Sequence, residues 1–120
     1  MMMTTKVGDH VFIIKDGSLM MAVSKGDSAL FTVTFNGRIP EDGIPVLFTV
    51  KAKRDNSVMI QKNALANNGA VDIDLCSSDT NKLEYNVDYV WDIRVLYSES
   101  DVDTPMIPSP FVVLEVAGDV

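Results

Sequence analysis

Hydrophobic and polar residues alternate with a period of two along most of the chain. The clearest case is Val71, Ile73 and Leu75, which are separated by Asp72 and Asp74. Successive side chains of a strand point to opposite faces, so this alternation predicts strands with one buried and one exposed face. No segment keeps the helical period of about 3.6 residues. The pattern therefore predicts an all-β protein.

Turn residues divide the chain into about seven to nine short strands. Asp16-Gly17 lies between two apolar runs and predicts a hairpin, because glycine adopts a positive φ without a Cβ clash. Residues 77–83 are expected to form a loop or one helical turn. A series of this kind predicts an antiparallel β-sandwich or barrel. The expected strands are residues 11–14, 19–23, 29–35, 46–53, 58–61, 71–75, 87–97 and 111–116.

The length of 120 residues corresponds to one domain and allows one hydrophobic core. No repeat, linker or low-complexity tract divides the chain. We therefore expect a single sandwich domain over residues 1–120, with residues 1–9 as a flexible N-terminus. The early apolar run at residues 11–14 is too short for a secretory signal, and no run approaches the length of a membrane span. These features predict synthesis in the cytoplasm without membrane insertion.

The charge and the cysteine and histidine counts exclude several classes of function. Ten Lys and Arg face seventeen Asp and Glu, which gives a net charge of −7 and argues against nucleic-acid binding. One cysteine and one histidine exclude an intrachain disulfide, a cysteine-based zinc site and a multi-histidine metal centre. We therefore predict no cofactor and no transition-metal site.

Candidate catalytic groups are few and lack the context that catalysis needs. His10 precedes the first predicted strand of the core and has no Gly-x-Ser-x-Gly partner motif. Cys76 has no neighbouring His or Lys in the sequence and is expected to be a buried or half-buried inert thiol. Asp101 and Asp103 lie in an acidic turn that resembles an oxygen-rich calcium loop without the EF-hand spacing. The sequence predicts a protein that is not an enzyme and leaves calcium binding at this turn open.

The long strand over residues 87–97 carries two opposed patterns. Trp91 and Tyr97 share the phase of its aliphatic residues, which predicts a core face. The alternative is an exposed sugar-stacking site formed by Trp91, Tyr97, Asp101 and Asp103. Apolar residues also occupy the outward phase of this strand and other positions that one small core does not need. Their surplus predicts an assembly surface that a second protein covers, formed by Met20, Met21, Leu47, Val90 and Leu96.

Five short motifs follow one another in an order that resembles a family of phage proteins. They are I-K-D-G-S-L at residues 14–19, K-G-D-S-A-L-F-T-V-T at 25–34, L-F-T-V-K at 47–51, Y-V-W-D-I-R-V at 89–95, and the segment from Thr104 to Val113. The chain resembles small prophage tail proteins from Firmicutes, which are similar to the immunoglobulin-like N-terminal domain of phage baseplate upper proteins. The resemblance covers nearly all of the chain after about residue 12.

The resemblance implies an immunoglobulin-like sandwich and a structural role in a phage or prophage tail. Its expected partners are other tail or baseplate proteins and further copies of the same chain, and it becomes part of the virion on assembly. The sequence shows no receptor-binding extension after the last strand, so an adaptor or accessory subunit is expected. A carbohydrate-binding or adhesion-type sandwich is the alternative function.

Overall fold

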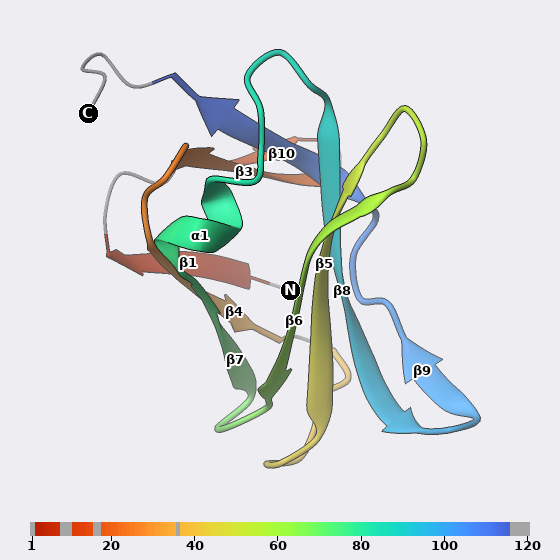
Figure 1. Cartoon of the computed structure of the whole chain (residues 1–120). Coiled ribbons are helices and arrows are strands. Elements are labelled where there is room, and N and C mark those ends of the chain that lie inside the picture. The colour runs from red at the N-terminus through yellow and green to blue at the C-terminus, as the bar shows by residue number, and fades with distance from the viewer. Residues whose placement is uncertain (1, 8–10, 16–17, 36, 116–120) are drawn as a thin grey trace.

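The computed structural model describes residues 2–7, 11–15, 18–35 and 37–115, with side chains described for residues 20–35 and 37–115. It forms two β-sheets that pack face to face, with one short helix between the last strand of the smaller sheet and the long strand of the larger one (Figure 1). The elements are β1 (Met2–Val7), β2 (Val11–Lys15), β3 (Ser18–Ser24), β4 (Ala29–Thr34), β5 (Pro45–Ala52), β6 (Val58–Leu65), β7 (Ala70–Leu75), α1 (Ser77–Thr80), β8 (Tyr89–Ser98), β9 (Asp101–Asp103) and β10 (Ser109–Leu114).

The smaller sheet has the order β1-β4-β7, and the larger sheet has the order β2-β3-β10-β8-β5-β6 with β9 paired to β8. The all-β sandwich predicted from the alternation is confirmed. The hairpin predicted at Asp16-Gly17 is present as the antiparallel pair β2–β3, although the two turn residues lie outside the described residues. Of the two alternatives expected for residues 77–83, a loop or one helical turn, the structure has the helical turn, α1.

Three details of the predicted fold are wrong. The described residues contain ten strands, more than the seven to nine expected. The sandwich is not wholly antiparallel, because β10 runs parallel to β3, with Phe111 opposite Met21. Residues 2–7, assigned to a flexible terminus, form β1 and pair with β4. The sequence did not reveal the last two features because both depend on which distant strands become neighbours.

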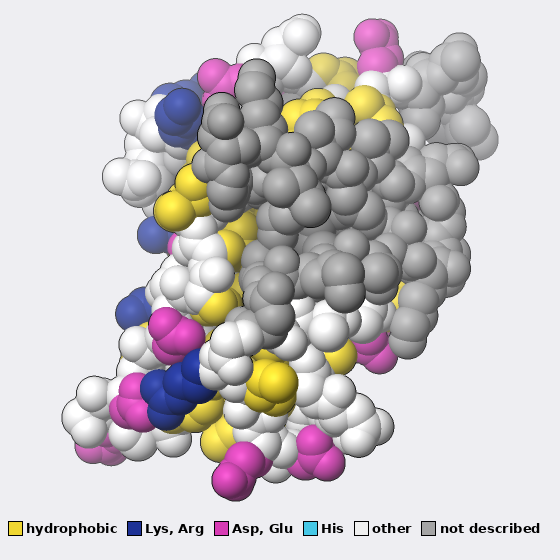
Figure 2. All heavy atoms as spheres, turned by 180° about the vertical axis from the view of Figure 1, so that it is seen from behind, with side chains coloured by type: hydrophobic (Ala, Val, Ile, Leu, Met, Phe, Trp, Pro, Cys, Tyr) yellow, Lys and Arg dark blue, Asp and Glu magenta, His cyan; other side chains and the backbone are white. Residues whose placement is uncertain are grey.

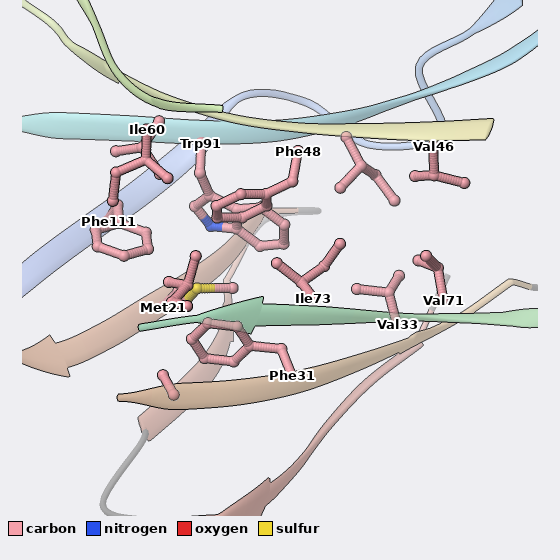
Figure 3. Close-up of a cluster of buried hydrophobic side chains, with 14 of the residues drawn as sticks. Met21, Phe31, Val33, Val46, Phe48, Ile60, Val71, Ile73, Trp91 and Phe111 are labelled. Atoms are coloured by element: carbon pink, nitrogen blue, oxygen red, sulfur yellow. The ribbon is translucent and has the colours of Figure 1, made fainter. Parts of the chain in front are cut away.

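The core lies between the two sheets and contains most of the predicted inward residues, together with others such as Met21 and Leu83 (Figure 3). Phe31 and Val33 of β4 and Ile73 of β7 face Phe48 of β5 and Trp91 of β8 across the sandwich. Each of these side chains is at most 1% exposed. Burial of an aromatic or branched side chain stabilises a fold by about 1.5–3 kcal/mol, so this layer is the main source of stability. The last predicted strand ends in the structure at Leu114.

The strand order follows that of immunoglobulin-type sandwiches. In such domains strands B and E pair in one sheet, while strands G, F and C are neighbours in the other, extended by C′ in the variable type. Here β4 pairs with β7, and β10, β8, β5 and β6 are successive neighbours. The hydroxyl of Tyr89, at the start of β8, accepts a hydrogen bond from the backbone N–H of Glu84 at 2.9 Å. This contact corresponds to the tyrosine corner of that fold.

An aromatic residue occupies the position of one of the two disulfide cysteines of antibody domains. The second cysteine of those domains follows the corner tyrosine by two residues, and here that position is Trp91. Its ring packs on Phe48 of β5 with centroids 5.8 Å apart and planes tilted by 39°. Phe48 and Trp91 therefore pack within the larger sheet, whereas the antibody disulfide joins strands B and F of opposite sheets. Aromatic packing of this kind needs no oxidising compartment.

Candidate docking surface

Outward side chains of the larger sheet form one continuous area across the three neighbouring strands β6, β5 and β8, which we call the outer face. On β8 the alternate residues are buried, so the residues between them point away from the core. The strand pairings β5–β8, β5–β6, β8–β9 and β8–β10 place the other members beside them. The outer face consists of Pro45, Leu47, Thr49, Lys51, Val58, Gln61, Asn63, Leu65, Val90, Asp92, Arg94 and Leu96, bordered by Val102 and Pro110.

The centre of the outer face is polar. An open groove of about 340 Å³ lies over it, with Asp92 and Arg94 of β8 in its lining. Gln61 Nε2 donates to Thr49 Oγ1 at 3.4 Å, which joins β6 to β5 on this side. Within the described part of the chain the ion pairs join other residues, so the charges of Asp92 and Arg94 are unpaired.

Apolar side chains flank this polar centre on both sides along the strands. Toward one end, Leu65 lies opposite Pro45, and Leu96 lies opposite Val102. Leu65 is 63% exposed. Toward the other end, Val90 of β8 lies between Pro110 of β10 and Lys51 of β5. On the far side of Lys51 lies Val58 of β6, which is 53% exposed. Large exposed apolar side chains in register on adjacent strands are typical of an interaction surface.

The outward side of the smaller sheet differs in chemistry. Thr32 Oγ1 donates to Asp72 Oδ1 at 2.7 Å across β4 and β7, and Thr34 and Asp74 share that side. Thr32 and Asp72 thus satisfy each other within the sheet, as on a solvated surface. The larger sheet therefore has the more suitable surface for a protein partner. The view of the whole molecule from behind shows acidic, basic and hydrophobic side chains interspersed over its described atoms (Figure 2).

Four of the five residues predicted for assembly lie on the outward side of the larger sheet. Leu47, Val90 and Leu96 belong to the outer face and are half-buried. Met20 is half-buried and, by alternation along β3, lies on the same side. The assignment of Met21 is wrong, because this side chain is completely buried in the core. Met21 pairs with the inward-facing Phe111 of β10, and that pairing is not visible in the sequence.

The alternative sugar-binding site is not assembled as predicted. Trp91 is 1% exposed and its ring faces Phe48, so it has no free face for a ligand. Tyr97 is half-buried, and the guanidinium of Arg38 covers its ring at 3.5 Å from the centroid. The Tyr97 hydroxyl is buried and makes no hydrogen bond to the described residues. The prediction of Trp91 as a ligand-stacking residue is therefore wrong.

The acidic turn is held by an arginine that the sequence analysis did not select. Arg38 donates to both carboxylate oxygens of Asp101, at 3.0 and 2.7 Å. This hydrogen bond holds the pKa of the Asp101 carboxyl below its usual range. Asp103 lies further along β9, opposite Val95. No cluster of three metal-ligating side chains occurs among the described residues. The carboxylate of Asp101 is already paired with the guanidinium of Arg38.

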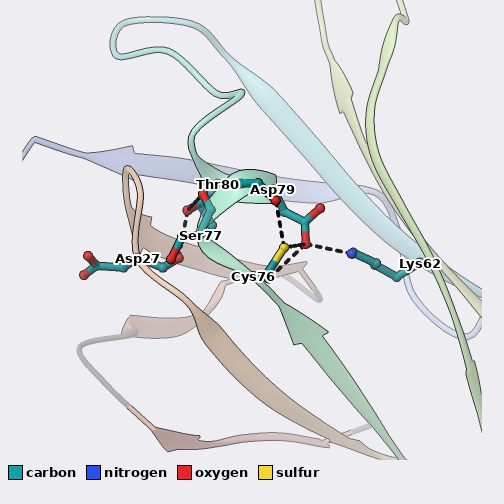
Figure 4. Close-up of polar contacts among 7 residues, drawn as sticks. Asp27, Lys62, Cys76, Ser77, Asp79 and Thr80 are labelled. Carbon is teal, nitrogen blue, oxygen red and sulfur yellow. Dashed lines mark hydrogen bonds and ion pairs between the residues drawn. The ribbon is translucent and has the colours of Figure 1, made fainter.

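Cys76 belongs to a polar cluster that joins the two sheets (Figure 4). Its backbone N–H donates to Asp79 Oδ2 at 2.9 Å, and its thiol lies 3.1 Å from the same oxygen. Lys62 of β6 donates to that oxygen at 2.7 Å. The predicted burial of Cys76 is wrong, since the residue is exposed at the start of α1.

The carboxyl of Asp79 is the buried member of this cluster. Burial by itself raises its pKa, but the hydrogen bonds from Lys62 and Cys76 outweigh burial, so the pKa lies below its usual range. The sequence analysis expected a loop or one helical turn here but did not connect it with Lys62, which lies on β6. The cluster is a structural tie between the edge of the larger sheet and the segment that follows β7.

The basic run Lys51, Lys53 and Arg54 contributes to a second groove, of about 370 Å³, at the end of the larger sheet. Lys53 and Arg54 line it together with Asp88 and Asn86. Because Asp88 lies beside the two basic side chains, the charges in this groove do not favour binding of an anion. His10 lies outside the described residues.

Comparisons with known proteins add no identification. No protein-family model matches the chain. No curated protein matches it. The tail-protein resemblance therefore stays a prediction. Within the part of the chain that the structure describes, no helix is long and apolar enough to span a membrane.

Proposed function

We propose that this protein is a non-enzymatic structural or adaptor subunit of a phage or prophage tail, of the baseplate type. It acts by docking to neighbouring tail proteins through the outer face of its larger sheet. The observation that carries the docking role is the outer face itself, where exposed apolar side chains of several strands lie in register around an unpaired Asp and Arg. The tail assignment is supported by the five sequence motifs.

The composition of the outer face suits a protein interface. Such interfaces combine apolar contact with polar groups that find partners across the boundary. Leu96 and Leu65 supply the apolar contact, while Asp92 and Arg94 supply charges whose pairing requires a correctly placed partner. The strands of the larger sheet are already paired before binding, so binding orders few backbone groups and loses little conformational entropy.

The proposal assigns no catalytic role to the groups whose pKa is shifted. Each perturbed pKa belongs to a local structural contact: Arg38 with Asp101, Lys62 with Asp79, and Asp55 with Ser57. None of these groups lies on the outer face. In the proposed role the chain is made in the bacterial cytoplasm, where its net charge of −7 keeps free subunits soluble, and it becomes virion-associated on assembly.

The experiment is the analysis of tail particles purified after prophage induction in the bacterium that encodes the protein. Mass spectrometry is expected to find the chain in assembled tails at a fixed ratio to other tail proteins. A second arm compares Leu96→Lys, on the outer face, with Leu30→Lys as the matched control. Leu30 is equally half-buried but lies opposite Asp74 on the smaller sheet.

The expected result is that Leu96→Lys reduces incorporation into tails at least about tenfold, because a charge placed in an apolar contact costs at least about 1.4 kcal/mol of binding. Leu30→Lys is expected to incorporate normally. Tails that lack the chain while the cells contain it in soluble form would refute the tail role. Equal incorporation of both variants would refute docking through the outer face.

A further inference from the structure

The outer face has an internal symmetry along β8. Its four outward residues in order are Val90, Asp92, Arg94 and Leu96, half-buried except for the exposed Arg94. Reversal of this order exchanges one apolar residue for another and exchanges the acid for the base. A surface with that property is complementary to a second copy of itself turned by 180°.

We propose that two copies of this chain associate through their outer faces about a two-fold axis. This axis lies between the two faces, level with Ile93, and runs across the strands, perpendicular to β8. In this arrangement the two β8 strands face each other and run in opposite directions. Asp92 meets Arg94 of the second copy, and Val90 meets Leu96 of the second copy. The inference deepens the proposed function, on which it rests, by naming the partner that occupies the outer face.

Strand β6, which β5 separates from β8, obeys the same symmetry once the register shift between Val50 and Lys51 is counted. Leu65 lies in the row of Pro45, and Val58 lies in the row of Lys51. These rows are equally far from Ile93 along the sheet, on its two sides, because β5 pairs with β8 in unbroken register from Val46 to Ala52. The axis therefore places Leu65, which is 63% exposed, against Val58 of the second copy, which is 53% exposed.

The polar rows between them also match. Gln61 lies in the row of Thr49, and Asn63 lies in the row of Leu47. The axis brings Gln61 against Asn63 of the second copy, and two carboxamides are able to donate to and accept from each other. On the other side of β8, Val102 meets Pro110 of the second copy, since these residues lie in the rows of Leu96 and Val90.

Two orientations of a two-fold axis would bring the outer faces together, one perpendicular and one parallel to β8. The charges favour the perpendicular axis. An axis parallel to β8 would place Arg94 on Arg94 and Asp92 on Asp92, and like charges in contact oppose association. The perpendicular axis forms two Asp–Arg pairs per dimer, because each symmetry-related contact occurs twice. A partner of different sequence would need no such relation between Val90 and Leu96 or between Val58 and Leu65. The coincidence of both relations favours a second copy.

Sedimentation equilibrium of the full chain tests this arrangement through charge reversal. Asp92→Arg places two arginines in contact twice per dimer, so the dissociation constant is expected to rise at least about tenfold. Asp92→Arg combined with Arg94→Asp restores both ion pairs with their direction exchanged, and the constant is expected to return to within about threefold of the original. Asp74→Arg, on the exposed side of β7, is the matched control and should leave it unchanged.

The emission of the single tryptophan, Trp91, confirms that each variant is folded before it is compared. A wild-type chain that stays monomeric up to about 1 mM would overturn the proposal, since that limit corresponds to only about 4.1 kcal/mol of binding. An unchanged constant for Asp92→Arg, or a charge-exchanged variant that stays weak, would also overturn it. If the chain is a monomer in solution but still enters tails through its outer face, only the dimer proposal is refuted. If it forms the dimer but is absent from assembled tails, only the tail role is refuted.

Discussion

The contact between Lys62 and Asp79 predicts a measurable stability change because it bridges the open side of the sandwich. Lys62 belongs to β6, the edge strand of the larger sheet, and Asp79 belongs to the helical turn that follows β7 of the smaller sheet. The two side chains are 33% and 8% exposed. Lys62→Met removes the ammonium group and keeps a chain of similar length. We expect it to leave the nearly buried carboxylate of Asp79 without its cation.

The magnitude of this effect lies between two limits. Loss of one partner of a fully buried ion pair costs about 3–5 kcal/mol, and loss of a hydrogen bond to a charged group costs about 1.5–3 kcal/mol. Asp79 retains the backbone N–H and the thiol of Cys76 at 2.9 and 3.1 Å. Lys62 is also partly solvated, so we expect about 2 kcal/mol. For a chain of this length that corresponds to a fall of roughly 8 °C in Tm.

The pH dependence of the stability loss in Lys62→Met is a second, independent test. The Asp79 carboxyl has a lowered pKa in the folded protein, so its stabilising contribution is present above the ordinary carboxyl pKa of about 3.9 and is lost as the pH falls further. In Lys62→Met the principal hydrogen bond that lowers this pKa is gone, while burial still raises it. The stability difference between the variant and the parent protein is therefore expected to narrow below about pH 4.

Urea unfolding followed by Trp91 fluorescence measures these free energies, because Trp91 is the only tryptophan and is buried. Asp79→Asn and the double variant complete a double-mutant cycle, in which we expect a coupling of about 1–2 kcal/mol. Lys53→Met is the matched control, since Lys53 is exposed and makes no ion pair among the described residues. A loss below about 0.5 kcal/mol in Lys62→Met, or a loss that does not change with pH, would refute this reasoning.

Three further predictions concern the core, the acidic turn and the free thiol. Phe48→Ala is expected to cost about 3–5 kcal/mol in urea unfolding, because Phe48 is fully buried against Trp91; a cost below about 1 kcal/mol would contradict the assigned core. Arg38→Ala is expected to lower Tm by no more than about 3 °C, because its pair with Asp101 is solvent-exposed. A larger fall that persists at high salt would contradict that view. Cys76 is exposed, so the folded protein should react with one equivalent of a disulfide reagent such as dithiobis(nitrobenzoate), whereas a reaction that requires urea would show that the thiol is covered.

Much of the fold followed from local alternation in the sequence. The inward phases of residues 29–35, 46–52 and 71–75 correspond to buried side chains, because the two-residue period of a strand assigns each side chain to a face whatever its neighbours are. Turns occupy the gaps between the predicted strands as well, with Gly26 and Gly69 at positive φ. These features depend on neighbours in sequence alone.

The candidate site depended on information that the alternation lacks. The sequence assigned Val90 and Leu96 to the outward phase, but not the pairing that brings Leu65 beside Pro45 and Val58 beside Lys51. Gln61 and Asn63, which complete the face, are ordinary polar residues in the sequence. Outward residues become a surface only when the order and register of the strands are known.

The sequence by itself determined that this is an all-β protein, which residues of most strands point inward, and that cysteine or multi-histidine metal chemistry is excluded. Tertiary structure decided the rest. The parallel pairing of β3 with β10 buried Met21. The approach of β6 to the helical turn after β7 brought Lys62 to Asp79. The register of β6, β5 and β8 produced the outer face. The physical reason is that side-chain direction follows from backbone geometry within one strand, whereas contacts between strands depend on which distant segments bury their apolar faces together.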